Sequence, residues 1–311
     1  MRLIFLGSPG FALPSLEALR AAGHDIALVV TQPDRPAGRG KRTTPPAVAA
    51  YAREHYLPLW QTASLRGAEA EERLRGVGAD GMALAAFAAL VPRNILDLAP
   101  ILNVHPSLLP RWRGAAPIQA ALLAGDAETG VSIIRLVQAM DAGPILLQER
   151  VPIAPEDDYL TLEPKLAELG ARMLVEALQH RPAEKTQDDA LATYSRKIER
   201  DDGRVDWSRP ANEIWRQVRA YRGWPQAFTT WDGKLLKILR AWPGPSEWRA
   251  VPGRVVASRD PAVTTGQGEA LLVMTGAGAL RLDELVLEGR RPQSGSDFQR
   301  GYPQLIGSRL A

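Results

Sequence analysis

Two polar side chains close an otherwise apolar segment, at Asn103 and His105 in the run ILNVHP. Side chains at positions i and i+2 of a strand project to the same face, so these two are expected to lie side by side. Pro106 cannot donate to a sheet ladder and favours extended backbone at His105, which places the pair at the carboxyl end of a strand. Open α/β sheets bind ligands at that edge. A strand terminus with satisfied polar groups fits the pair equally well on its own.

The elements around this pair predict a mostly parallel α/β sheet. Arg2–Leu6 and Ile26–Thr31 read as strands, and the segment from Pro14 to Ala22 between them reads as a helix closed by Gly23. This strand–helix–strand order is typical of a sheet with right-handed crossovers. The first turn, GSPG, is not G-x-G-x-x-G, which disfavours a dinucleotide site. Further strands are expected at 81–87, 101–105, 131–136 and 144–149, and an amphipathic helix at 162–177.

The pattern changes after His180. Residues 181–204 combine a proline and a cluster of charges with few positions suited to burial, and they read as a linker. Five short strands separated by Gly and Pro follow, at 227–231, 235–242, 253–256, 270–274 and 280–286. Strands of this length and spacing are typical of a small barrel of oligonucleotide-binding type, an OB-like barrel. We therefore expect a catalytic domain at 1–184, a linker at 185–204 and a C-terminal OB-like barrel at 205–311.

Composition excludes several classes of protein. The chain has no cysteine, so disulfides and thiolate nucleophiles are ruled out, and its four scattered histidines do not predict a zinc site. No apolar run is long enough for a membrane span, and the first residues read as a strand rather than a signal peptide, so a cytoplasmic protein is expected. The segment from Val205 onward holds 15 basic and 10 acidic residues. That excess hints at a polyanionic partner, although on charge alone a solvated surface explains it better.

Longer blocks of sequence resemble a known family. The run NVHPSLLPRWRGAAPIQ and the downstream GDAETGVSI are similar to the signature of folate-dependent formyltransferases. The blocks TQPDRPAGRGK (31–41) and YSRKIERDDGRVDW (194–207) narrow this to the methionyl-tRNA formyltransferase family, and the similarity covers nearly the whole chain. The resemblance implies a Rossmann-like N-terminal domain and a C-terminal barrel. It also implies transfer of a formyl group from 10-formyltetrahydrofolate to the amino group of methionine on initiator tRNA.

The resemblance assigns the catalytic set to Asn103, His105 and Asp141. Formyl transfer needs donors where an oxyanion forms and a route for one proton, and it needs neither a metal nor a covalent nucleophile. The Asn103 amide can donate, His105 can donate or shuttle a proton, and Asp141 can hold the imidazole and favour its charged form. Taken alone, Asp141 before Ala-Gly would be read as a turn former.

The resemblance also implies two binding sets. The folate-binding set is Phe87, Ala88, Ala89, Leu90, Ser107, Leu108, Leu109, Pro110 and Gly143. The family's folate wall usually has Gly where this chain has Ala88, and the added methyl group changes the expected shape of the pterin pocket. The tRNA-binding set is Arg39, Lys41, Arg42, Arg216 and Arg219. The first three lie in a Pro- and Gly-rich segment, 34–46, which is expected to be a long exposed loop.

Two rival functions fit part of this pattern. A formyltransferase of the same fold that acts on a sugar nucleotide or another small amine would use the same Asn, His and Asp. It would not explain the basic loop or the basic C-terminal third. A tRNA-binding protein without catalysis would not explain polar groups at a sheet edge. The expected protein is a monomeric enzyme without a metal that binds folate and initiator methionyl-tRNA.

Overall fold

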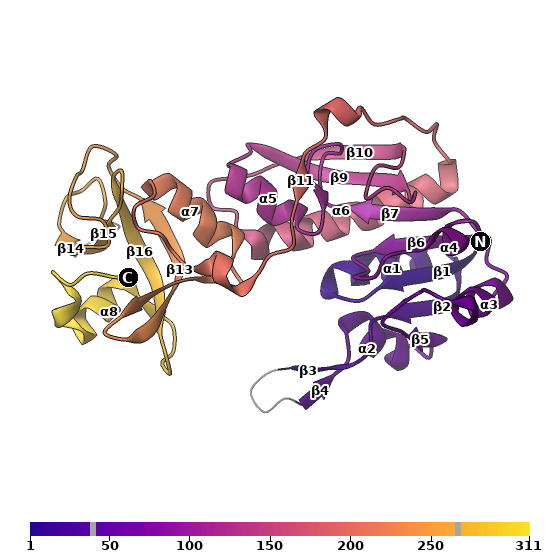
Figure 1. The fold of residues 1–311 in the computed structure, drawn as a ribbon, viewed down its shortest axis with the longest axis horizontal. Coiled ribbons are helices and arrows are strands. Elements are labelled where there is room, and N and C mark those ends of the chain that lie inside the picture. The colour runs from indigo at the N-terminus through magenta and orange to yellow at the C-terminus, as the bar shows by residue number, and fades with distance from the viewer. Residues whose placement is uncertain (38–41, 265–268) are drawn as a thin grey trace. The chain divides into compact units, whose positions relative to one another are not determined.

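The computed structural model describes residues 1–37, 42–264 and 269–311 (Figure 1). Its contacts divide the chain into two units, which are described separately below. The first unit comprises residues 1–117, 127–153 and 162–196. The second comprises residues 197–311 together with two short segments, 118–126 and 154–161.

The first unit is built on a seven-stranded sheet in the order β10-β9-β7-β6-β1-β2-β5. Five neighbouring strands are parallel: β1 (Arg2–Gly7), β2 (Asp25–Thr31), β5 (Leu59–Gln61), β6 (Gly81–Ala85) and β7 (Ile101–His105). The strands β9 (Glu128–Arg135) and β10 (Ile145–Pro152) run antiparallel at one edge. The predicted Rossmann-like, mostly parallel sheet is therefore confirmed.

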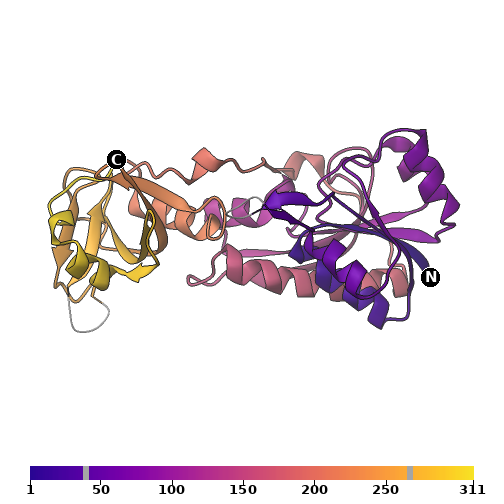
Figure 2. The same cartoon turned by 90° about the horizontal axis from the view of Figure 1, so that it is seen from below.

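Helices cover both faces of this sheet (Figures 1 and 2). On one face, Ile4, Met82 and Ile101 share a core with apolar side chains of α3 (Ala68–Gly76) and α4 (Arg93–Leu96). The other face carries α1 (Leu13–Ala21), α2 (Ala47–Glu54) and α6 (Tyr159–His180). Because strand side chains alternate, Asn103 and His105 lie on the α3/α4 side and Val104 on the α6 side.

The helix α6 approaches β7 closely at Gly170. A Cβ atom at Gly170 would lie 2.4 Å from Val104 Cγ1, closer than any real side chain tolerates. Glycine therefore allows the helix to pack directly onto the strand that carries Asn103 and His105. The predicted amphipathic helix at 162–177 is the central part of α6.

Two segments expected to be irregular contain paired strands. In the segment expected to be a loop, β3 (Arg35–Ala37) pairs antiparallel with β4 (Arg42–Thr44). Arg39 and Lys41 lie outside the described residues, as does the side chain of Arg42. In the segment expected to be a linker, β11 (Tyr194–Ser195) pairs with β8 (Arg113–Gly114), and residues up to 196 group with the first unit.

The second unit contains a sheet in the order β12-β13-β16-β15-β14. Its strands are β12 (Ala227–Trp231), β13 (Lys234–Pro243), β14 (Val255–Ser258), β15 (Ala270–Met274) and β16 (Ala279–Leu287), and a short β17 (Gln293–Ser294) pairs with β16. The C-terminal residues link the two edge strands. Val255 N–H donates to Ser308 O at 2.9 Å, and Thr230 N–H donates to Ala311 O at 2.9 Å. The sheet and the helices α7 (Ala211–Ala220) and α8 (Gly295–Gly301) enclose a core with Trp207, Trp231 and Phe298.

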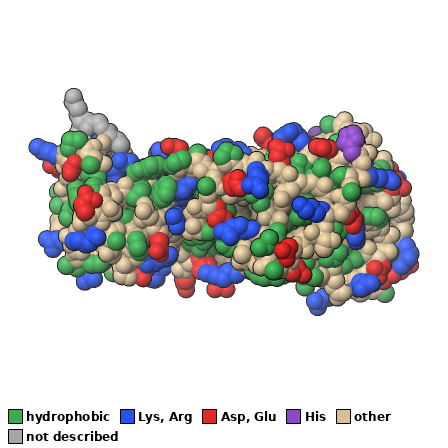
Figure 3. Space-filling view, turned by 90° about the horizontal axis from the view of Figure 1, so that it is seen from above, with side chains coloured by type: hydrophobic (Ala, Val, Ile, Leu, Met, Phe, Trp, Pro, Cys, Tyr) green, Lys and Arg blue, Asp and Glu red, His purple; other side chains and the backbone are tan. Residues whose placement is uncertain are grey.

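Lys and Arg side chains are interspersed with Asp and Glu over the face drawn in Figure 3. Among the described residues, no helix is long and apolar enough to cross a membrane.

Candidate active site

The carboxyl end of β7 presents Asn103 and His105 on one face, as the sequence predicts. Both are almost fully buried, with 5% and 4% of their surface exposed. The strand lies inside the sheet between β6 and β9, where Asn103 is in register with Leu84 and Ile134. Within the described ranges, the Asn103 side-chain amide makes no hydrogen bond to the protein. It is not one of the fully enclosed polar atoms without a partner, so the amide is open at this edge and available to a ligand.

His105 is held by the loop that follows it. Its Nε2 lies 3.0 Å from Trp112 O. A carbonyl oxygen only accepts, so Nε2 donates this hydrogen bond and Nδ1 is the basic nitrogen of the neutral ring. Nδ1 lies 3.8 Å from Asp141 Oδ2. Burial lowers the pKa of His105, while the Asp141 carboxylate and the bond to Trp112 act in the opposite direction. The imidazole is therefore mainly neutral at neutral pH.

Asp141 is fixed in a tight turn between β9 and β10. Its φ of +49° lies in the left-handed region, which Asp tolerates better than most residues. Its Oδ2 accepts a hydrogen bond of 2.8 Å from Gly114 N–H. The turn predicted at this position thus also brings a carboxylate to His105, and the three residues of the predicted catalytic set meet at one edge of the sheet.

The loop after β7 is braced by buried hydroxyl and amide groups. Ser107 Oγ donates to Arg111 O at 2.6 Å, so its side chain serves the loop itself. Ser132 Oγ donates to Ser107 O at 2.7 Å, and Gln148 Nε2 donates to Leu109 O at 2.9 Å. The segment Ser107–Pro110 is consequently held against β9 and β10 before any ligand arrives.

The remaining residues of the predicted folate set lie in two short segments, 87–90 after β6 and the turn that contains Gly143. Phe87 is buried in the sheet core, whereas Ala88 and Leu90 are exposed. Ala86 precedes them with a φ of +47°, which redirects the chain at the end of β6. At Gly143 a Cβ would lie 1.8 Å from Arg135 O, so no larger residue fits there. Binding of folate by this set stays a prediction.

The sequence did not reveal that residues 187–195 brace the same loop. Thr193 Oγ1 accepts from Trp112 N–H at 2.9 Å, and Ser195 Oγ accepts from Ala116 N–H at 3.1 Å. Gln187 is also buried. These are single uncharged polar residues in a charged stretch, and nothing in their spacing marks them as part of a site.

The two arginines predicted on α7 are engaged within the second unit. Arg216 Nη1 donates to Ala124 O at 3.2 Å. Arg219 donates from Nε to Asp157 O at 2.6 Å and from Nη2 to Ala154 O at 2.8 Å. Burial lowers the pKa of the Arg219 guanidinium, which the nearby Asp157 and Asp158 partly offset. Both side chains therefore have structural partners, and their contact with tRNA stays a prediction.

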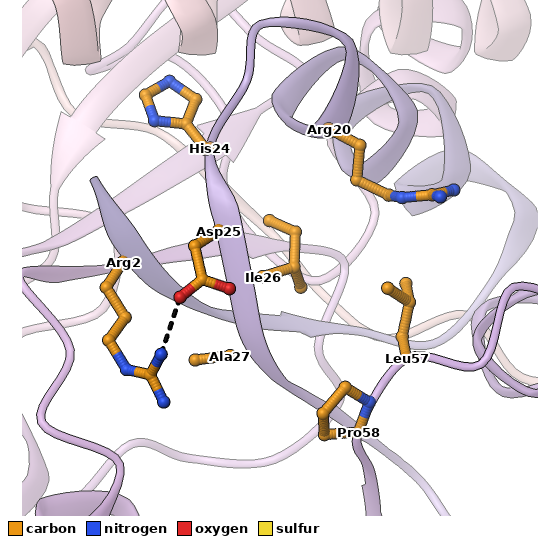
Figure 4. A pocket seen from close by; sticks show the side chains of 8 residues that line it. All are labelled: Arg2, Arg20, His24, Asp25, Ile26, Ala27, Leu57 and Pro58. Carbon is orange, nitrogen blue, oxygen red and sulfur yellow. Dashed lines mark hydrogen bonds and ion pairs between the residues drawn. The ribbon is translucent and has the colours of Figure 1, made fainter.

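A hollow of about 460 Å³ lies at the other end of the strands, where β1 and β2 begin (Figure 4). Arg2 pairs there with Asp25 at 2.6 Å, and Arg20 donates to Tyr51. Its charged groups are thus occupied, and the hollow is remote from the carboxyl edge that carries Asn103 and His105.

Comparison with known proteins identifies the family. Residues 1–178 match the family described as formyl transferase, and residues 197–303 match the formyl transferase C-terminal domain. Fold and domain order thus define a formyl transferase. A methionyl-tRNA formyltransferase of Gluconobacter oxydans is 44% identical, with 100% of both chains covered. One of Pseudomonas paraeruginosa is also 44% identical, covering 96% of this chain and 95% of the relative. The chain belongs to the methionyl-tRNA formyltransferase family.

A solved structure supports the fold. The N-formyltransferase of Helicobacter canadensis, in complex with folinic acid and dTDP-3-aminofucose, has a TM-score of 0.63 and 16% sequence identity. The alignment covers 90% of this chain and 98% of that protein. At this identity the likeness concerns the fold alone.

Proposed function

We propose that this protein transfers the formyl group of 10-formyltetrahydrofolate to the amino group of methionyl initiator tRNA, giving N-formylmethionyl-tRNA. The observation that carries the proposal is the full-length match, at 44% identity, to a relative named for this activity. The grouping of Asn103, His105 and Asp141 at the sheet edge supports it. The enzyme would act in the cytoplasm as a monomer, with folate as cosubstrate.

The chemistry is an exchange of one carbon–nitrogen bond for another. The methionyl amine forms a bond to the formyl carbon, and the bond from that carbon to the folate nitrogen breaks. The amine loses one proton and the folate nitrogen gains one, so no net proton is consumed. During the exchange the formyl oxygen carries negative charge, which the site has to stabilise.

Asn103 suits the role of the donor to this oxygen. The residue is 5% exposed and its amide has no hydrogen-bond partner among the described residues, so no internal hydrogen bond must break when a ligand binds. The strand β7 is fixed on both sides by β6 and β9, which keeps the amide in place. Removing one donor of this kind typically costs about 3–4 kcal/mol of transition-state stabilisation.

His105 and Asp141 suit the transfer of the proton. Nε2 is committed to Trp112 O, which leaves Nδ1 to take a proton from the amine, either directly or through water. The imidazolium that forms is stabilised by the carboxylate at 3.8 Å. Because burial lowers the pKa of His105, the ring gives up the proton readily to the leaving nitrogen.

The proposed tRNA contacts are Arg39, Lys41 and Arg42 in the basic segment 34–46, with Arg216, Arg219 and the second unit as a further surface. Phosphate contacts give affinity, while base contacts give specificity. Ser107–Pro110, Phe87–Leu90 and Gly143 are proposed to hold the folate. The position of the loop after β7, already braced by Ser132 and Gln148, supports that assignment.

A direct assay tests the proposal. Purified protein is given charged initiator tRNA and 10-formyltetrahydrofolate, and N-formylmethionine is measured after hydrolysis of the ester. A parallel reaction replaces the tRNA with a dTDP-amino sugar. Formylation of the tRNA is the expected result, and formylation of the sugar alone would refute the proposal.

A further inference from the structure

Gln187 lies at the centre of a buried polar network behind Asp141. Its Nε2 donates to the carbonyl oxygens of Asp141 and Gly143, each at 2.7 Å. Its Oε1 accepts from Arg113 Nε at 3.0 Å and Arg113 Nη2 at 2.9 Å. Arg113 also contacts Asp189 at 2.7 Å. The amide of Gln187 is thus fully used, and it ties together three separate stretches of chain.

We propose that Gln187 is a positioning residue for the reaction, holding the turn Met140–Gly143 so that the Asp141 carboxylate faces His105. The inference rests on the proposed function, because it names a residue that serves the same site. Gln187 touches backbone and Arg113, and it acts on the chemistry only through Asp141.

The turn needs such a hold for two reasons. The left-handed φ of +49° at Asp141 is unfavourable for a residue with a side chain, so the turn relaxes unless its surroundings fix it. Its two inward carbonyl groups, at Asp141 and Gly143, would be left without partners if Gln187 were lost. Both costs are removed when the turn rearranges and the carboxylate moves away from Gly114 N–H.

The contact between Gln187 and Arg113 connects Gln187 to the second partner of the Asp141 carboxylate. Arg113 is 3% exposed and continues into Gly114, whose N–H binds the Asp141 carboxylate. Gln187 therefore fixes both ends of one hydrogen bond: the turn that supplies the acceptor and the strand that supplies the donor. A displacement of about 1 Å in such a group can cost about a hundredfold in rate.

The position of the carboxylate can be read from His105. Among the described residues, Asp141 is the one charged group that shifts the pKa of His105, and it does so upward. The guanidinium of Arg113, in β8, is bonded to Gln187 and Asp189 and not to His105. If the turn relaxes, the pKa of His105 falls, because burial is then opposed by a more distant charge.

The test uses Gln187→Met in the full-length protein. Methionine keeps the length and neutrality of the side chain and removes its donors. Gln217→Met is the matched control, because Gln217 Nε2 also donates to two carbonyls, Asp202 O at 2.7 Å and Arg204 O at 3.0 Å, in the second unit. The readouts are thermal stability, kcat and KM for tRNA formylation, and the titration of His105 by NMR. His105→Gln identifies its signal among the four histidines.

Gln187→Met is expected to lower kcat about tenfold or more with KM changed less than about twofold, and to move the His105 midpoint to lower pH. Gln217→Met should leave both kcat and the midpoint unchanged. An unmoved His105 midpoint overturns the proposal, whatever kcat does. A moved midpoint with wild-type kcat would instead refute the role of Asp141 in the proposed function and leave the positioning intact. If Gln187→Met does not fold, Gln187→Asn replaces it, and failure of both to fold would overturn the proposal by assigning Gln187 to the fold.

Discussion

The polar groups at the end of β7 and the arginines of α7 contrast sharply in how they are satisfied. The Asn103 amide has no hydrogen-bond partner among the described residues and His105 Nδ1 faces Asp141 at 3.8 Å, whereas Arg216 and Arg219 are bonded to carbonyl oxygens of their own unit. A polar group at a ligand-binding edge that has no partner in the fold is open to a ligand, while a group with such a partner is explained by the fold. Residue type alone does not distinguish the two cases.

The contrast predicts the largest effect at Asn103. Asn103→Ala should lower kcat by about 10²–10³ because a donor to the developing oxyanion is lost. The free energy of unfolding should not fall, since the amide has no partner to lose. Single-turnover formylation and thermal melting measure the two effects. Wild-type kcat together with a clear loss of stability would show that Asn103 serves the fold and not the reaction.

Asp141→Asn should lower kcat by about 10² and change the pH dependence. In the proposed mechanism the neutral form of His105 takes the proton, so activity should fall as pH drops through the pKa of His105, which burial holds below 6.5. Removal of the Asp141 charge lowers that pKa further, so the acid limb moves to lower pH. A pH–rate profile from pH 5 to 8 checks this. An acid limb that stays in place or moves to higher pH would contradict the assigned role.

The lowered pKa of His105 also makes the free energy of unfolding depend on pH. The unfolded chain binds a proton below pH 6.5 that the folded state takes up only at lower pH. This contribution to stability is therefore present above pH 6.5 and is lost as pH falls toward the folded pKa. Asp141→Asn should steepen that loss in urea unfolding measured across the same pH range.

Arg219→Ala tests the arginines of α7, whose side chains are bonded within the fold. Loss of two charge-assisted hydrogen bonds to Asp157 O and Ala154 O should cost about 2 kcal/mol of stability. If Arg219 serves the fold alone, the Kd for tRNA should change less than about twofold, whereas the proposed tRNA contact requires a larger rise in Kd. Arg209→Ala is the control, because Arg209 forms an exposed ion pair with Glu213 that contributes little. A fall in tRNA affinity at unchanged stability would support the tRNA assignment of Arg219.

The smallest predicted effect concerns Arg39. Arg39→Ala should lower kcat/KM for charged initiator tRNA about tenfold, or about 1.4 kcal/mol, the scale of one lost specific contact. Lys41→Ala and Arg42→Ala should each reduce the salt dependence of tRNA binding by about one phosphate contact. Arg35→Ala is the comparison variant, since Arg35 is bonded to Gln32. Equal kcat/KM for wild type and Arg39→Ala across a salt series would make the segment a solvated surface.

Local patterns in the sequence predicted the elements that depend on neighbours along the chain. The alternation at Ile101–His105 identified both the strand and the face of its polar pair, and the spacing of Leu162 and Leu166 identified α6. Asp141 could not be joined to His105 by periodicity, because that contact depends on the antiparallel return of β9 and β10; the family resemblance supplied it. Gln187 was missed because it donates to backbone carbonyls, which any sequence provides, and because its side-chain partner Arg113 lies 74 positions away in the sequence.

The partners of Arg216 and Arg219 escaped prediction for a similar reason. Their three-residue spacing suggests an exposed cationic face on a helix. The segments 118–126 and 154–161, distant in sequence, provide the carbonyl oxygens that receive them. Helical periodicity tells which side chains share a face but not what that face meets.

The bracing of the loop after β7 by residues 187–195 has a consequence for the order in which the chain is synthesised. All strands of the first sheet lie before residue 181, yet Gln187, Thr193 and Ser195 are translated later and bind to Arg113, Trp112 and Ala116. A nascent chain that ends after α6 would contain every strand of the sheet but lack the residues that hold this loop. The proposed site would then be completed later than the sheet on which it is built.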